Sequence, residues 1–362
     1  MFFLNYRNFE NLILSNHLNI FLTGVVFRSL IFIILIFFPF YHVNFGSLSP
    51  LSFQKFADLD FYLIFGVYEF QINKFLEIYK NIIFLNFSNI DNRFPGPLFP
   101  LIISLTKYSN DFTILMSILI ILVEIFTFYF WSKFFYKKFN GYVSLLFGFM
   151  PIPLYFGFLH STDIIFYFFT SFIFLIYCQN IKTNKLIIYL LVVGLVLTRP
   201  ACISVLLALI IHSLIYKKNY KFIFIMTIIL ATTIFYYLPY FIFETRLISS
   251  NEYFKLNLST YLNFALNYIT KFIYIFGFIK SDSGNIYFYL MRCGCAMIFL
   301  IGYFYSLKNY KSFDFLIINF TLIPIVIFLF PAYRYSLPIS PILFMNFVSF
   351  VIFLRNKLAS NN

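Results

Sequence analysis

Residues 111–138 read DFTILMSILIILVEIFTFYFWSKFFYKK, and this stretch decides the class of the fold. Its apolar part contains a single charge, Glu124, and it has the length of about twenty residues that a helix needs to cross the hydrocarbon core of a bilayer. Lys133, Lys137 and Lys138 follow directly. Because basic residues beside membrane helices concentrate on the cytoplasmic side, the stretch predicts a membrane helix that ends inside.

The rest of the chain repeats this pattern. Of the 362 residues, 62% are hydrophobic and 11% are charged, a balance that a protein with a polar, water-facing exterior does not sustain. The sequence therefore predicts an all-α integral membrane protein, one polytopic domain over residues 1–362. About ten transmembrane helices are expected, near residues 21–43, 111–131, 141–159, 163–180, 186–198, 201–216, 222–243, 284–306, 313–331 and 335–354.

The basic residues fix an orientation for these helices. They lie on alternate connections and are opposed by one nearby acid, Asp314. By the positive-inside rule both termini are expected in the cytoplasm, and the net charge of +13 needs no nucleic-acid partner. The inner set is Lys133, Lys137, Lys138, Lys182, Lys185, Lys217, Lys218, Lys221, Lys308, Lys311, Arg355 and Lys357.

Two further apolar stretches, residues 95–106 and 261–279, do not fit this alternation as spans. If either crossed the membrane alone, every later lysine cluster would lie outside, so both are interpreted as helices on or dipping into the outer leaflet. Two long extracytoplasmic loops result, residues 44–110 with surface-lying helices and residues 244–283.

Two charges lie within predicted membrane helices, Arg28 and Glu124. Both are about 10 to 12 Å from the inner ends of their helices at 1.5 Å per residue. A lone charge at that depth is costly, so we expect them to form a structural ion pair.

The four cysteines all lie in apolar segments, so neither a disulfide framework nor a zinc site is expected. Cys293-Gly294-Cys295 is interpreted as small residues at a contact between helices.

The remaining ionisable residues gather on the predicted outer face. Asp58 and Asp60 lie two residues apart in the first outer loop, where such a pair can bind a divalent cation or supply a general base. Asp is also common at helix starts as a cap, and that structural alternative stays open.

Three other outer positions carry the same ambiguity. His160-Ser161-Thr162-Asp163 forms a tight outer turn that can cap the next helix or contribute to a site. Arg199 follows a short helix and precedes Pro200, which predicts a polar cavity around it rather than lipid. Arg334 lies between two prolines at the mouth of the last helix, where it can clamp a phosphate or extend to lipid headgroups.

In this order the motifs resemble those of the GT-C superfamily, polytopic glycosyltransferases that include polyprenyl- and dolichyl-phosphate-sugar-dependent mannosyltransferases. Asp58-Leu59-Asp60-Phe61-Tyr62 looks like the acidic motif of their first extracytoplasmic loop. The other matching segments are Arg93-Phe94-Pro95-Gly96-Pro97-Leu98-Phe99-Pro100, His160-Ser161-Thr162-Asp163, Leu197-Thr198-Arg199-Pro200 and Tyr333-Arg334-Tyr335-Ser336-Leu337-Pro338. The sequence departs from the superfamily in lacking the D-E pair of protein O-mannosyltransferases.

The resemblance implies an inverting transfer of a sugar from a polyprenyl phosphate to a hydroxyl of a glycan, lipid or protein acceptor. Asp60, or Asp58, would act as catalytic base, and Arg199, Arg334 and Arg93 would bind the donor phosphate, with His160 and Asp163 as further site candidates. No cofactor is required, although Asp58 and Asp60 can hold Mg²⁺ or Mn²⁺. The expected location is a bacterial inner membrane, with the site facing the periplasm or exterior.

Two other functions stay open from the sequence. A polysaccharide polymerase or ligase is also multi-spanning with arginines in its outer loops. A transporter of lipid-linked carriers would need no chemistry, but it favours charged or broken-helix sites near the bilayer midplane and two repeated halves. No such repeat is evident in the chain, and its charges lie at one face.

Overall fold

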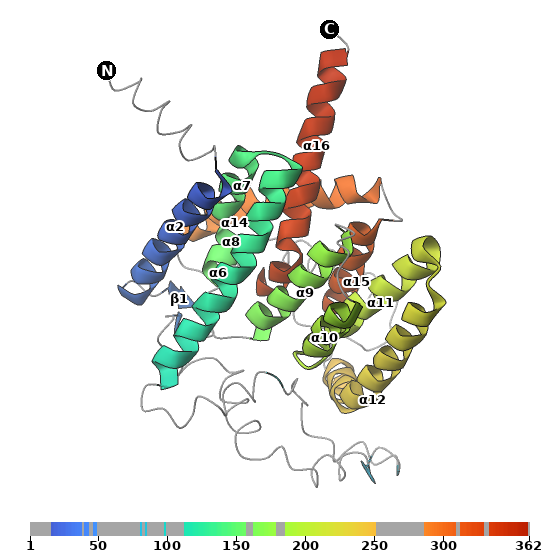
Figure 1. The fold of residues 1–362 in the computed structure, drawn as a ribbon. Coiled ribbons are helices and arrows are strands. Elements are labelled where there is room, and N and C mark those ends of the chain that lie inside the picture. Colours follow the sequence, from blue (N-terminus) through green and yellow to red (C-terminus); the bar gives the residue numbers. More distant parts are fainter. Residues whose placement is uncertain are drawn as a thin grey trace, which may run out of the picture.

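Helices make up nearly all of the residues that the computed structural model of the chain describes (Figure 1). It describes residues 16–37, 40–42, 46–48, 80–81, 84, 98, 112–156, 162–178, 185–250, 286–308, 312–328 and 333–360. The α-helices are α2 His17–Phe37, α6 Phe112–Lys138, α7 Gly141–Gly148, α8 Pro151–Phe156, α9 Thr162–Cys178, α10 Lys185–Val196, α11 Cys202–His212, α12 Tyr220–Ser250, α14 Ile286–Leu307, α15 Phe313–Phe328 and α16 Ser340–Ser360. A π-helix, η3 (Ser213–Lys217), follows α11, and a 3-10 helix, η5 (Tyr333–Ile339), precedes α16.

Four of the described helical segments are long and apolar enough to cross a membrane, judged by length and composition. They are His17–Ile34, Ile118–Lys138, Tyr220–Leu238 and Ser336–Ser360. Five shorter apolar helices accompany them. Each of the ten predicted segments contains a helix, and the chain fits the predicted class of membrane-embedded helical proteins.

The first predicted helix is wrong at its C-terminal end. The prediction extended it to residue 43, but α2 ends at Phe37 and a short strand, β1 (Phe40–His42), follows. This strand pairs antiparallel with β2 (Gly46–Leu48). Pro39 explains the end of the helix, because proline has no backbone N–H and disfavours helix in the residue before it.

The predicted helix over residues 141–159 is wrong as a continuous element. It is divided into α7 and α8, and α8 begins at Pro151. The Asn140 side chain accepts a hydrogen bond from the Val143 N–H at the start of α7, and the Phe149 N–H donates to Leu146 O at its end. Local hydrogen bonds therefore satisfy backbone groups at both ends of α7, and a count of apolar residues does not detect them.

Aromatic side chains form the centre of the helix bundle. Trp131 of α6 is fully buried, and its ring stacks on Phe135 and on Phe174 of α9 at centroid distances of 5.5 and 5.6 Å. Phe135 also contacts Phe147 of α7 at 4.8 Å. Such pairs add about 0.5 to 1.5 kcal/mol each beyond the area that they bury, and they join α6, α7 and α9.

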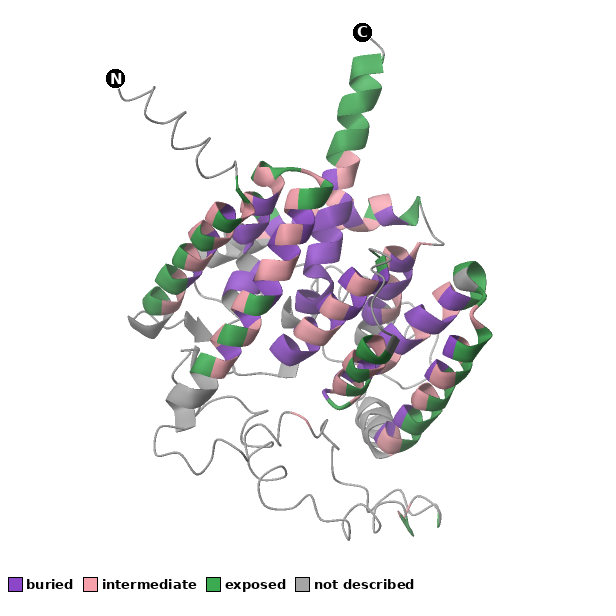
Figure 2. Cartoon of the chain, in the orientation of Figure 1, coloured by how far each residue is buried: buried purple, intermediate pink, exposed green. Residues whose placement is uncertain are grey.

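The outer faces of two helices are apolar as well. Leu22, Val26 and Leu30 of α2 are more than half exposed, as are Phe224 and Phe235 of α12. Figure 2 shows these helices as exposed along much of their length, with the buried residues between them. Continuous apolar surface of this kind is unusual on soluble monomers and suits contact with lipid.

The sequence analysis predicted a close helix contact around Gly294. In the structure the close contact is at Gly302, where α14 packs against α16. A Cβ on Gly302 would lie 2.1 Å from the Leu343 carbonyl oxygen, whereas one on Gly294 would meet nothing within 4 Å. Cys295 is buried, but the interpretation of Cys293-Gly294-Cys295 as the packing motif is wrong for its glycine. Only a residue without a side chain lets the two backbones approach at position 302.

Candidate functional site

The candidate site is centred on an ion pair between two helix ends. Asp163 lies in the first turn of α9, and Arg199 follows α10. Arg199 Nη1 donates to Asp163 Oδ1, and the side chains are 16% and 3% exposed, respectively. The structure therefore joins two residues, 36 positions apart in sequence, that were predicted as separate site candidates.

Local hydrogen bonds hold Arg199 in place. Thr198 Oγ1 donates to Leu195 O at 2.6 Å, and the Arg199 carbonyl accepts the Cys202 N–H at 3.1 Å. The Tyr237 hydroxyl of α12 donates to Val196 O at 2.8 Å. Hydrogen bonds of residues before and after Arg199 in the sequence therefore hold the turn between α10 and α11.

The surroundings of the pair favour its charges. Asp163 lies in the first turn of its helix, where the N-terminal end of the helix dipole stabilises a carboxylate. The guanidinium carbon of Arg199 lies 5.8 Å from the centroid of the Phe166 ring, within the range of a cation–π contact. A guanidinium has five N–H donors, so holding a carboxylate is compatible with binding a phosphate at the same time.

Two other motif segments reach this region. The Leu98 N–H, in the predicted proline-rich segment, donates to Leu197 O at 2.9 Å, directly before Thr198 and Arg199. The helix η5, which contains Arg334, packs against α9, and its Ser336 and Leu337 are buried. Of Arg334 itself the structure describes only the backbone.

The remaining predicted site residues lie outside the described part of the chain. They are the acids Asp58 and Asp60, Arg93 and His160. Among the residues that the structure does describe, no group of three or more His, Cys, Asp or Glu side chains could hold a metal ion.

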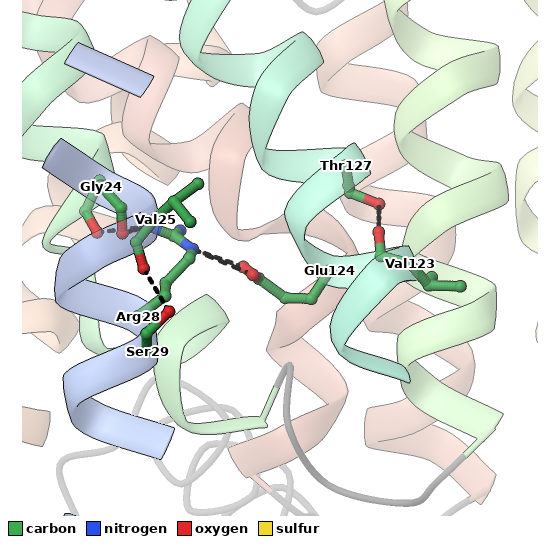
Figure 3. A network of polar contacts seen from close by, with 8 residues as sticks. Gly24, Val25, Arg28, Ser29, Val123, Glu124 and Thr127 are labelled. Atoms are coloured by element: carbon green, nitrogen blue, oxygen red, sulfur yellow. Dashed lines mark hydrogen bonds and ion pairs between the residues drawn. The ribbon is translucent and has the colours of Figure 1, made fainter. Parts of the chain in front are cut away.

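A second ion pair, between Arg28 and Glu124, was predicted from sequence and is confirmed (Figure 3). Arg28 Nε donates to both oxygens of Glu124, at 2.9 and 3.0 Å, and Nη1 donates to Gly148 O at 2.8 Å. Both charged side chains are 1% exposed, and the Arg28 guanidinium carbon lies 3.6 Å from the Phe128 ring centroid. These contacts join α2, α6 and α7, so the pair is part of the packing of the bundle.

The pairing of Asp163 with Arg199 was not predicted. A signal for it was present, because an acid and an arginine, which carry opposite charges, both lie at helix ends that the sequence predicts on the same side of the membrane. Partner choice, however, depends on which helices are neighbours, and α9 and α10 are adjacent in the fold.

Comparison of the chain with protein-family models, with curated proteins and with solved structures found no match.

Proposed function

We propose that this protein is a membrane glycosyltransferase of the GT-C type, which transfers a sugar from a polyprenyl-phosphate donor to an acceptor hydroxyl on the extracytoplasmic face. The observation that supports it most is the Asp163–Arg199 ion pair beside the Leu98–Leu197 hydrogen bond. Three of the five motif segments that resemble the superfamily meet there. A fourth, η5, packs against the helix that carries Asp163.

The proposed reaction is a displacement with inversion at the anomeric carbon. The acceptor oxygen forms the new bond to that carbon while the bond to the phosphate oxygen of the donor breaks. Asp60, or Asp58, takes the proton of the acceptor hydroxyl. Arg199, with Arg334 and Arg93, stabilises the charge of the departing polyprenyl phosphate, and Asp163 orients Arg199.

The proposal includes ten spans with both termini in the cytoplasm of a bacterial inner membrane. In Figure 1, α2 begins and α16 ends on the same side of the bundle, the side where α6 also ends at Lys137 and Lys138. An even number of spans is in keeping with that arrangement. The lysine-bearing ends would face the cytoplasm, and Asp163 and Arg199 would face the periplasm.

Labelling of single cysteines with a membrane-impermeant reagent tests this orientation. In a background whose four native cysteines are replaced by serine, cysteines at Asn86 and Asn257 should react from outside the inner membrane. A cysteine at Asn219, which follows Lys217 and Lys218, should react only after permeabilisation. Labelling at position 219 in intact spheroplasts would reverse the orientation and remove the proposed site from the outer face.

Donor binding tests the role of Arg199. Arg199→Gln should weaken binding of polyprenyl phosphate to the purified protein about ten-fold or more. A charge-assisted hydrogen bond contributes about 1.5 to 3 kcal/mol, and each 1.4 kcal/mol is a factor of about ten. Binding can be measured from the ligand-dependent rise in melting temperature in detergent.

Two comparisons separate phosphate recognition from damage to the fold. Polyprenol, which has the same chain without the phosphate, should bind wild type and Arg199→Gln alike. Asp163→Asn breaks the ion pair but keeps the guanidinium, so it should lose less phosphate affinity than Arg199→Gln. If wild type and Arg199→Gln bind polyprenyl phosphate equally, Arg199 has no part in donor recognition.

A further inference from the structure

A pocket lies at the end of α9 opposite to Asp163. It has a volume of about 530 Å³, and its polar lining consists of Lys137, Lys138, Tyr305, Asp314, Asn346 and Ser349. Cys178, the last residue of α9, also lines it, whereas Asp163 lies in the first turn of that helix. Fifteen residues at 1.5 Å each place the pocket about 22 Å from the Asp163 end of α9.

Part of the polar lining lacks partners. Asn346 is 4% exposed, and its Nδ2 has no hydrogen-bond partner. Lys138 Nζ donates to the Met345 sulfur at 3.2 Å, which is a weak acceptor. Within the described residues, neither Lys137 nor Lys138 has a carboxylate within ion-pair distance. The pocket lining therefore holds two ammonium groups that form no ion pair with the Asp314 carboxylate, and a buried amide lies beside them.

We propose that this pocket binds a phosphate group, carried by a lipid headgroup or by a soluble phosphate. Lysine ammonium groups bind phosphate as point charges, and both lysines line the pocket. Two lysines against the one carboxylate of Asp314 leave the lining positive. The aromatic side chains Phe134 and Phe174 complete the wall and suit the glycerol or acyl part of a lipid.

The location favours this ligand class over a second sugar-donor site. Lys137 and Lys138 form the last turn of α6, on the side of the bundle where α2 begins and α16 ends. Basic residues at this level of a membrane helix meet the headgroup layer of the bilayer. The proposal does not depend on glycosyl transfer, because none of its residues belongs to the Asp163–Arg199 region.

The test uses the full chain in a phosphate-free neutral detergent and follows its melting temperature. The probes are inorganic phosphate, matched in ionic strength with chloride, and dihexanoyl phosphatidylglycerol, matched with a galactosyl diacylglycerol that has no phosphate. Lys137→Gln/Lys138→Gln should weaken the apparent affinity of the effective probe at least ten-fold, equivalent to about 1.4 kcal/mol. Both lysines are exposed, so the change should leave folding intact.

Two further variants make the outcome specific. Lys221→Gln/Lys357→Gln removes two exposed lysines that do not line the pocket and should bind like wild type. Asn346→Leu removes the amide at similar volume; because the amide nitrogen is buried behind the pocket surface, this variant should also bind like wild type. A response to phosphatidylglycerol alone identifies a lipid headgroup, and a response to inorganic phosphate identifies a soluble ligand. Equal binding by the pocket and control lysine variants, or no response to either probe, overturns the proposal.

Discussion

Asp60→Asn is expected to lower the rate of sugar transfer by about 10²- to 10⁴-fold, the usual contribution of general-base catalysis. Asn is close in size to Asp but cannot accept the proton of the acceptor hydroxyl. Expression and binding of polyprenyl phosphate should stay close to wild type, because the phosphate is assigned to the arginines. The measurement is transfer from a polyprenyl-phosphate sugar by purified, reconstituted protein.

Asp58 serves as the matched control for Asp60. If residues 57–62 are helical, side chains two positions apart point about 200° apart, so only one carboxylate can face the site. Asp58→Asn should then have the milder effect. If the two acids instead share a divalent cation, both variants lose activity and a chelator inhibits the wild type. A purified Asp60→Asn protein that keeps most of its transfer rate would exclude Asp60 as base and direct attention to Asp58 or Asp163.

The helix positions follow from the sequence because apolar length is a strong signal. A stretch of about twenty apolar residues predicts a membrane helix. The shorter predicted segment at residues 186–198 also forms a helix, α10. The breaks at Pro39 and Pro151 were missed although both prolines are visible in the sequence. Counting hydrophobic residues ignores that a proline lacks a backbone donor and favours the end or the start of a helix.

The candidate site was only partly accessible from sequence. Residue type and the side of the membrane pointed to Asp163 and Arg199 separately, but their pairing depends on the packing of α9 beside α10. The hydrogen bond between Leu98 and Leu197 joins backbone groups about a hundred residues apart, and backbone groups carry no sequence signal. Arg28 and Glu124 were easier to pair because each was the lone deep charge of its helix.

Breaking the Arg28–Glu124 ion pair has the largest expected effect on the free energy of unfolding. Glu124→Met should lower the free energy of unfolding by about 3 to 5 kcal/mol, the usual cost of leaving one member of a buried ion pair without its partner. Methionine fills much of the space of either side chain, so a cavity contributes little to the loss. Arg28→Met should cost less, since an isolated carboxyl group can take up a proton and become neutral whereas arginine cannot.

The double variant decides whether these losses come from the pair itself. Arg28→Met/Glu124→Met removes both charges, and its free energy of unfolding in mixed micelles should return to within about 1 to 2 kcal/mol of wild type, because apolar replacements of buried pairs are often neutral. Ser29→Met, at the next and exposed position of α2, controls for the added methionine and should change little. If the two single losses simply add in the double variant, the residues act independently, and the contacts of Arg28 with Gly148 and Phe128 rather than its ion pair join α2 to α6 and α7.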